Sequence, residues 1–186
     1  ERAVWIGWSL GGQLAQRAAL RDPQRISGLV MVTASPRFVV GDGWPHAMAP
    51  ATLTQFARAL RRDHHQTLER FLSLQVQGDE AARETLRLLR QDIALRPEAD
   101  PLALEHGLEL LRTVDLRAGL GDIRCPTLWL FGERDTLVPA DLCDELERLM
   151  PAAEILILQG CAHAPFLSHP RQCLRALNHF LEPDHA

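Results

Sequence analysis

The sequence lacks the features that mark membrane, secreted and nucleic-acid-binding proteins. No apolar run approaches the ~18 residues that a membrane span needs, and no charged-then-apolar signal segment opens the chain. The net charge is −4, so the surface as a whole is not one that binds polyanions. We therefore expect neither a membrane nor a nucleic acid among the partners of this protein.

Cysteine is scarce, and its spacing gives no sign of a metal. The four cysteines form no C-x-x-C pair and no zinc-binding spacing: Cys125, Cys143, Cys161 and Cys173. We interpret them as reduced, mostly buried small hydrophobic residues of a cytoplasmic protein, with a disulfide as the less favoured alternative. No metal and no other cofactor is expected.

The sequence opens with a strand–helix–strand pattern. Residues 3–6 form a short apolar, strand-favouring run that stops at Gly7, and residues 26–32 form a second such run. Between them, residues 10–20 place apolar or small side chains at helical spacing. This order predicts a βαβ unit of a parallel sheet.

The middle of the chain differs from its two ends. Residues 37–122 show no convincing strand pattern, and helices are predicted at residues 51–62, 65–77, 80–95 and 102–114. After this block, strands are predicted at residues 127–131 and 154–158 and helices at residues 140–149 and 170–181. We therefore predict a core made of residues 1–36 and 123–186, with residues 37–122 inserted as an all-helical cap.

A candidate nucleophile lies between the first strand and the first helix. The segment Gly7-Trp8-Ser9-Leu10-Gly11 fits the pattern G-x-S-x-G, in which a tight turn holds the serine at strained backbone angles. The glycines two before and two after the serine leave room for neighbouring backbone. The helix that follows directs free N–H groups and its positive end at the site, so the Leu10 N–H can receive the oxyanion of a tetrahedral intermediate. The alternative is that Ser9 only caps the helix.

A serine nucleophile needs a base and an acid, in the chain order serine, acid, histidine. Asp135 follows the strand predicted at residues 127–131, at the carboxyl edge of the sheet, with Glu133 as its only serious rival. His163 lies in the loop after the strand predicted at residues 154–158, where it can carry protons. The other histidines lie in helices, early loops or the tail: His46, His64, His65, His106, His169, His179 and His185. The sequence thus predicts a Ser9–His163–Asp135 triad in a serine carboxylester hydrolase with the three-layer, mostly parallel α/β-hydrolase fold.

Further stretches match one family more narrowly. They are W-I-G-W-S-L-G-G at residues 5–12, A-S-P at 34–36, E-R-F-L at 69–72, G-L-E-L-L at 107–111, T-V-D-L-R at 113–117, L-V-P at 137–139 and A-H-A-P-F-L-S-H-P at 162–170. In these stretches the chain resembles the pimeloyl-[acyl-carrier protein] methyl ester esterases of biotin synthesis. The resemblance implies hydrolysis of the methyl ester of a pimeloyl group on acyl carrier protein through an acyl-enzyme.

The resemblance also implies two sets of contacts. The acyl chain would lie beside Ser9, Leu10 and His163 and against Phe71, Leu72, Ser73, Leu74 and Gln75. From the sequence alone, the three apolar members of the second set read as helix core. Cap arginines would contact the acidic carrier protein, at Arg70, Arg83 and Arg87, with Arg61, Arg62 and Arg90 adding to the patch. A solvated helix face is the alternative interpretation of these arginines.

In one respect the chain departs from the family pattern. The resemblance implies about seventy more residues before the serine, which would hold early strands and the second oxyanion amide. We therefore expect an N-terminally truncated relative, in which the front of the sheet is missing and the first strand has an open edge. Two other functions stay open: a general serine esterase or thioesterase of small acyl substrates, and an inactive fragment or binding scaffold.

Overall fold

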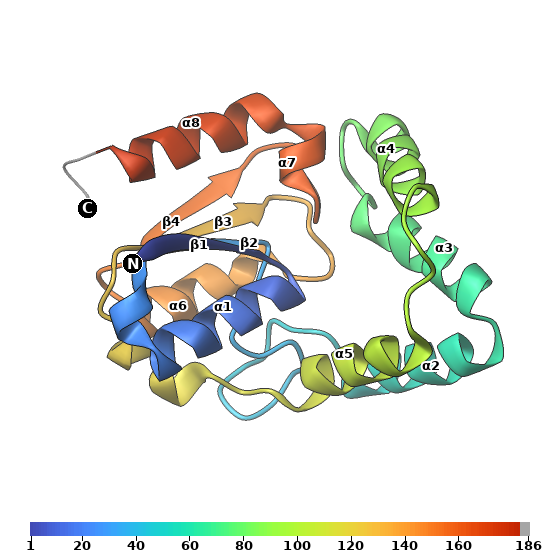
Figure 1. Ribbon diagram of the computed structural model, residues 1–186, viewed down its shortest axis with the longest axis horizontal. Helices are drawn as coiled ribbons and strands as arrows, with labels where there is room; N and C mark the ends of the chain where they lie inside the picture. Colours follow the sequence, from blue (N-terminus) through green and yellow to red (C-terminus); the bar gives the residue numbers. More distant parts are fainter. Residues whose placement is uncertain (183–186) are drawn as a thin grey trace.

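The computed structural model describes residues 1–182; residues 183–186, which include His185, lie outside the described part. Its centre is a four-stranded sheet in the order β1-β2-β3-β4, and every pairing is parallel (Figure 1). The strands are β1 (Ala3–Trp8), β2 (Ile26–Val32), β3 (Thr127–Gly132) and β4 (Glu154–Leu158). The second and fourth strands have the predicted bounds, and the other two run one or two residues further than predicted.

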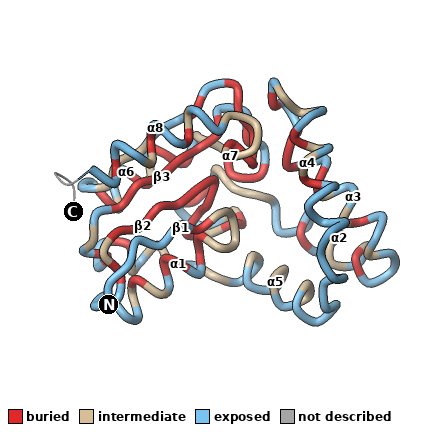
Figure 2. The backbone as a smooth tube through the Cα atoms, turned by 45° about the horizontal axis from the view of Figure 1, so that its top comes forward, coloured by how far each residue is buried: buried red, intermediate tan, exposed pale blue. Residues whose placement is uncertain are grey.

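Helices cover both faces of this sheet and make the three layers of the fold. One face packs on α1 (Leu10–Arg21) and α6 (Cys143–Leu149), and the other packs on α8 (Pro170–Leu181). Alternation along the strands divides the core: Leu29 and Trp129 face the first layer, whereas Val30 and Leu128 face α8. Burial on both faces explains why β2 and β3 are near-continuous apolar runs, drawn in the buried colour in Figure 2.

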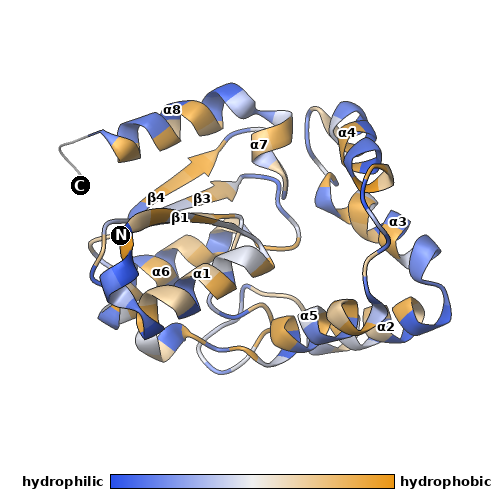
Figure 3. Cartoon of the chain, viewed as in Figure 1, coloured by the Kyte–Doolittle hydropathy of each residue, from blue (hydrophilic) through white to orange (hydrophobic). Residues whose placement is uncertain are grey.

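The two outer strands carry much of the exposed apolar surface of the core. Within residues 1–182, β1 pairs only with β2, so its other side is an edge of this sheet. Val4, Trp5 and Ile6 are exposed there, the last to 56%. At the opposite edge, β4 exposes Leu156 and Ile157 and is drawn in hydrophobic colours in Figure 3.

Four helices between β2 and β3, here called the cap helices, lie beyond the carboxyl ends of the strands (Figure 1). They are α2 (Pro50–Arg62), α3 (His64–Gln75), α4 (Ala82–Ala94) and α5 (Pro101–Thr113). Proline at the first position starts α2 and α5, and the Asp63 carboxylate caps α3 by accepting from Gln66 N. None of the helices within residues 1–182 is long and apolar enough to cross a membrane.

Two predictions in this block were wrong in detail. The second and third cap helices end and begin two residues away from their predicted bounds, because Gly78 takes a left-handed backbone with φ 85° and breaks the helix between them. Before α2, where no strand was predicted, the chain makes two isolated β-bridges, Val39 with Met48 and Gly41 with Trp44.

Charged side chains fasten the two ends of this block to each other. The Asp115 carboxylate accepts from the Arg37 guanidinium at 2.6 Å and from the Arg117 guanidinium at 2.8 Å. The Arg117 guanidinium also lies over the Trp44 ring, 5.5 Å from its centre. Hydrogen bonds from Arg117 and then from Arg37 hold the pKa of the Asp115 carboxyl far below its usual range. The connection entering the cap helices is thereby tied to the connection leaving them.

Candidate active site

Ser9 occupies a strained turn between β1 and α1. Its backbone has φ 54° and ψ −120°, a left-handed value that is rare for a residue with a side chain. Glycine makes this turn possible, since a Cβ on Gly7 would lie 2.6 Å from Gly12 Cα and a Cβ on Gly12 would overlap the Ala34 side chain. A Cβ on Gly11, two residues after the serine, would stand in open space. The prediction that a glycine is needed at this position for close approach of the backbone is therefore wrong, and the close approach occurs at Gly12.

His163 joins the serine to a carboxylate. Its Nε2 lies 2.8 Å from Ser9 Oγ, and its Nδ1 lies 2.8 Å from Asp135 Oδ2. The histidine and aspartate side chains are both buried, with 2% and 0% of their surface exposed. Burial protects this hydrogen bond from competing water, so that the imidazole is held in one orientation.

Asp135 is itself fixed by the turn that follows β3. Its Oδ1 accepts from the N–H groups of Leu137 at 2.8 Å and Val138 at 3.1 Å, which leaves Oδ2 for the histidine. Glu133, the rival acid, turns away: its carboxylate accepts from Gly160 N at 2.9 Å. The two carboxylates therefore have different tasks, and only that of Asp135 faces His163.

The backbone of His163 is held as firmly as its ring. Its carbonyl oxygen accepts from Trp8 Nε1 at 2.7 Å and from Thr33 Oγ1 at 2.8 Å, and its N–H donates to Gln75 O at 3.0 Å. Thr33 has φ 42°, a second strained residue at the end of a strand. Leu10, the predicted oxyanion donor, opens α1, where helical N–H groups have no carbonyl partner within the helix.

Two apolar cavities lie between Ser9 and the cap helices. The larger, of about 300 Å³, is lined by Trp8, Ser9, Leu10, Phe56, Leu60, Leu68, Phe71, Gln75, Ala103, Leu104, Gly107, Leu108 and Leu111. A smaller one, of about 40 Å³, reaches Leu74, Leu137 and His163 and shares Ser9, Phe56 and Phe71 with the first. The ring of Phe71 on α3 packs against the ring of Phe56 on α2, with 5.3 Å between the two ring centres. A cavity of about 480 Å³ opens at the other end of the sheet, around Thr127 and Glu154, away from the serine.

The predicted acyl contacts divide into two groups. Phe71, Leu74 and Gln75 line the cavities at Ser9. Leu72 instead packs with Val76 and Leu89 between α3 and α4, which is the helix-core role that the residues alone favoured. Ser73 is exposed, and its hydroxyl donates to Glu69 O.

The predicted arginine patch is exposed but partly neutralised. Arg70, Arg83 and Arg87 are all exposed. The Arg87 guanidinium pairs with Glu84 and also donates to Gln91, within the same helix. Arg90 pairs across helices with Glu69 at 2.7 Å, and Arg61 pairs with Glu105 at 2.7 Å.

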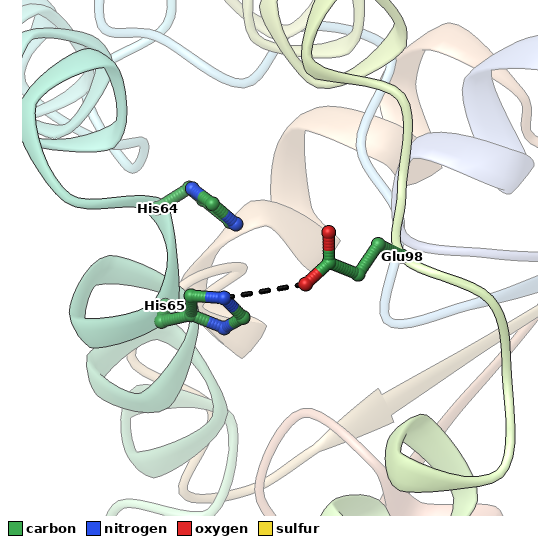
Figure 4. Close-up of side chains that lie close together, drawn as sticks. All are labelled: His64, His65 and Glu98. Carbon is green, nitrogen blue, oxygen red and sulfur yellow. Dashed lines mark ion pairs between the residues drawn. The ribbon is translucent and has the colours of Figure 1, made fainter.

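Among residues 1–182, one group of side chains could hold a metal ion, although no metal site was expected from the sequence. His64 and His65 begin α3, and Glu98 lies in the connection between α4 and α5 (Figure 4). One ligand atom from each residue lies within 4.8 Å of the others, and His65 Nε2 is 3.3 Å from Glu98 Oε1. This group is separate from the serine and lines neither cavity beside it.

Comparison with known proteins identifies the same fold and also finds closely similar sequences that share one name. The family model described as alpha/beta hydrolase fold matches residues 1–170. A pimeloyl-[acyl-carrier protein] methyl ester esterase of Photobacterium profundum is 44% identical over 180 residues, which cover 97% of this chain and 70% of that protein. The protein of the same name from Xanthomonas oryzae is 46% identical over 179 residues, covering 96% and 70%.

Solved structures show the same architecture at lower identity. An esterase from Exiguobacterium antarcticum superposes with a TM-score of 0.84 at 20% identity, over 95% of this chain and 65% of that one. A bromoperoxidase from Bacillus anthracis gives a TM-score of 0.84 at 23% identity, over 95% and 66%. The chain thus spans about two thirds of the length of these structures, and at such identity the likeness concerns the fold.

Proposed function

This chain belongs to the α/β-hydrolase fold family and, within it, to the pimeloyl-[acyl-carrier protein] methyl ester esterases. From that premise we propose that it hydrolyses the methyl ester of a pimeloyl group carried on acyl carrier protein. The main support is the pair of 2.8 Å contacts that links Ser9 Oγ through His163 to Asp135. The apolar cavity that opens at the same serine supports an acyl substrate.

The proposed reaction has two halves. In the first, His163 Nε2 takes the Ser9 proton while Oγ attacks the ester carbonyl, and the Leu10 N–H stabilises the oxyanion. His163 then gives that proton to the departing methoxide, so that methanol leaves and an acyl-serine remains. In the second half, a water molecule loses a proton to His163 and attacks the acyl-serine. The bond from the acyl carbon to Ser9 Oγ then breaks, His163 returns the proton to Oγ, and the substrate leaves as the free carboxylic acid, which ionises in water. Asp135 holds the imidazole in the required tautomer throughout and stabilises its positive charge.

The cap helices supply the proposed acyl site. The methylene chain would lie against Phe71, Leu74 and the aliphatic part of Gln75, beside Leu108 from α5. Leu72 supports this wall from behind by packing α3 on α4. We take residues 37–122 as the cap and residues 1–36 and 123–186 as the core that it covers.

The proposed partner is an acidic carrier protein that approaches the exposed face of α3 and α4. Arg70, Arg83 and Arg87 would meet its carboxylates and guide the encounter. Because Glu84 already binds Arg87, the carrier would have to compete with an internal partner at that position. We place the reaction in the cytoplasm, which agrees with four unpaired cysteines in this chain.

The chemistry is tested by active-site labelling and by hydrolysis. A fluorophosphonate probe should label the protein, and Ser9→Ala should abolish both labelling and turnover of p-nitrophenyl butyrate. Pimeloyl methyl ester on the carrier should then be turned over with a higher kcat/KM than any free ester. If labelling survives in Ser9→Ala, the nucleophile is misassigned. If short free esters are the best substrates, a general esterase is the correct function.

Carrier binding is tested by reversing charges on α4. The double change Arg83→Glu and Arg87→Glu should lower kcat/KM on the carrier-linked ester and leave that on the free ester nearly unchanged. Higher salt should have the same effect, because exposed charges are screened over about 8 Å at physiological ionic strength. Arg148→Glu on α6 is the matched control, since Arg148 also pairs with a glutamate three residues away. Equal losses on both substrates would mean that the α4 arginines only support the fold.

A further inference from the structure

We infer that Asp79, in the turn between α3 and α4, is a positioning residue that couples the cap helices to the catalytic histidine. The inference rests on the proposed role of His163. Asp79 is 7% exposed, and its carboxylate touches neither the serine nor the cavities beside it. Its hydrogen bonds show what it holds.

The Asp79 carboxylate accepts two backbone N–H groups from different parts of the chain. Oδ1 accepts from Ala81 at 2.7 Å, which fixes the turn leading into α4. Oδ2 accepts from Ala162 at 2.8 Å, one residue before the catalytic histidine. Hydrogen bonds to a buried charged group are about twice as strong as neutral ones. The carboxylate therefore ties the turn of the cap to the peptide that sets the position of His163.

Further contacts join the same two segments. Gln75 O accepts from His163 N at 3.0 Å, and Glu80 N donates to Gly160 O at 3.0 Å. Arg134, the neighbour of the catalytic acid, donates to Gly78 O at 3.2 Å and pairs with Glu80 at 2.9 Å. Residues 75–80, here called the latch turn, thus hold the loop of His163 and the residue next to Asp135 at once.

A physical consequence follows for the catalytic cycle. When the latch turn is seated, the imidazole lies 2.8 Å from both of its partners. Displacement of α3 and α4 from the sheet would break the bonds to Ala162 and His163 together and free the loop that carries the histidine. Proton transfer needs a hydrogen-bonded geometry, so a shift of this loop lowers the rate without removing any reacting group. The state of the cap helices is thereby transmitted to the base.

The test replaces the buried carboxylate with an amide. Asp79→Asn keeps the volume but presents an amino group to one of the two N–H donors. We expect kcat on p-nitrophenyl butyrate to fall by about tenfold to a hundredfold, since small displacements in active sites have effects of that size. KM should change little. A selective loss of kcat in a folded variant is the decisive result, because a residue that only supports the fold would not cause it.

Asp63→Asn is the matched control. Asp63 also accepts a backbone N–H from its own helix, that of Gln66 at 2.9 Å, but it has no contact with the His163 loop. It should lower the melting temperature and leave kcat and KM unchanged. If Asp79→Asn behaves like Asp63→Asn, Asp79 is only a structural residue and the inference is wrong.

A second variant keeps the inference testable if Asp79→Asn does not fold. Arg134→Ala removes an exposed side chain that binds Gly78 and Glu80 of the latch turn, and it leaves the buried carboxylate of Asp79 in place. A lower kcat in a folded Arg134→Ala supports the coupling, and an unchanged kcat contradicts it. These results are distinct from failure of the proposed function, which Ser9→Ala reports on its own.

A separate observation points to a second site. We propose that His64, His65 and Glu98 bind a divalent transition-metal ion such as Zn²⁺ (Figure 4). Imidazole nitrogen and carboxylate oxygen are ligands that zinc prefers, and three protein ligands leave a position for water. Arg61 lines the same small cavity as His64, and its guanidinium is paired with Glu105, so it does not present an unpaired positive charge to the ion. A bound ion would fasten the connection between α4 and α5 to the start of α3.

Titration with the metal alone tests this site. Zn²⁺ should raise the melting temperature saturably, because an ion that binds only the folded chain stabilises it by mass action. Mg²⁺, which prefers oxygen ligands, should not. His65→Ala and Glu98→Gln should each remove most of the Zn²⁺-dependent shift, whereas His106→Ala, an exposed histidine of α5, should keep it. No shift with Zn²⁺, or an equal shift in all variants, would overturn the proposal.

Discussion

Asparagine at position 135 should inactivate the protein without unfolding it, and the structure explains why. Oδ1 of Asp135 accepts two backbone N–H groups, those of Leu137 and Val138, while Oδ2 faces Nδ1 of His163. An amide NH₂ cannot replace Oδ1, because it would point at two other donors. In Asp135→Asn the NH₂ must therefore stand opposite His163 Nδ1.

This placement reverses the tautomer of the imidazole. With a donor opposite, Nδ1 has to accept, and the ring proton moves to Nε2. Nε2 then donates to Ser9 Oγ and cannot take its proton. The equivalent change in serine proteases lowers kcat by about 10⁴, which corresponds to about 5.4 kcal/mol at 1.36 kcal/mol per tenfold. We expect a loss of that order here.

The assay compares kcat and stability in two variants. Asp135→Asn keeps both backbone hydrogen bonds, so its urea midpoint should stay close to that of the parent protein. Asp135→Ala should lose comparable activity and also about 1–3 kcal/mol of stability, since two backbone donors lose their partner. If Asp135→Asn retains more than about a tenth of the activity, the tautomer argument and the role of the acid are wrong.

Three further changes test other parts of the structure. Asp115→Asn should cost about 1–3 kcal/mol at pH 7, measured by urea unfolding. Because the folded pKa of Asp115 is depressed, its contribution is present above the unfolded pKa of about 3.9 and is lost as pH falls from there towards the folded pKa. The variant should therefore lack this part of the fall in stability below about pH 4. Gly12→Ala should destabilise the protein by about 1–3 kcal/mol, because the added methyl group would overlap the Ala34 side chain. Gly11→Ala, whose methyl group would stand in open space, should be neutral or slightly stabilising. Equal effects of the two changes on the urea midpoint would contradict the packing argument. Burial raises the pKa of the Cys161 thiol to about 12, so a maleimide should modify it much more slowly in the folded chain than in urea, and equal rates would show that the thiol is accessible.

The sequence was sufficient for the α/β-hydrolase fold and for the order of its strands, whereas the short helix α7 (Pro165–Ser168) was not predicted. A strand that is buried on both faces, such as β2, is a continuous apolar run and can be recognised from its local composition alone. The bounds of β2, β4 and α8 are those predicted. The proximity of Ser9, His163 and Asp135 was predictable for a related reason. Parallel strands end at one edge of a sheet, so residues that follow β1, β3 and β4 must lie near one another.

The parts that could not be predicted depend on contacts between distant segments. Phe71 and Leu72 are adjacent and both apolar, and only the packing of α4 decides that the second points away from the cavity. Arg90 looked like part of a free basic stripe, but its partner Glu69 is on another helix. Asp79 follows a glycine in a turn and reads as ordinary turn chemistry, because nothing near it in the sequence indicates Ala162 as its partner.

The distance along the chain between the two ends of the site has a consequence for refolding. Ser9 and His163 are separated by 154 residues, and the bond from Trp8 to the histidine carbonyl spans 155. Contacts of such long range form slowly, because the chain loses the entropy of loop closure before the contact stabilises it. Helices such as α2 and α5 are built from neighbouring residues and should acquire their circular dichroism signal early. Hydrolytic activity should return last during refolding, so it measures the fraction of molecules that have folded completely. A screen of variants for hydrolysis would therefore select for the yield of folded protein as well as for the rate of the reaction.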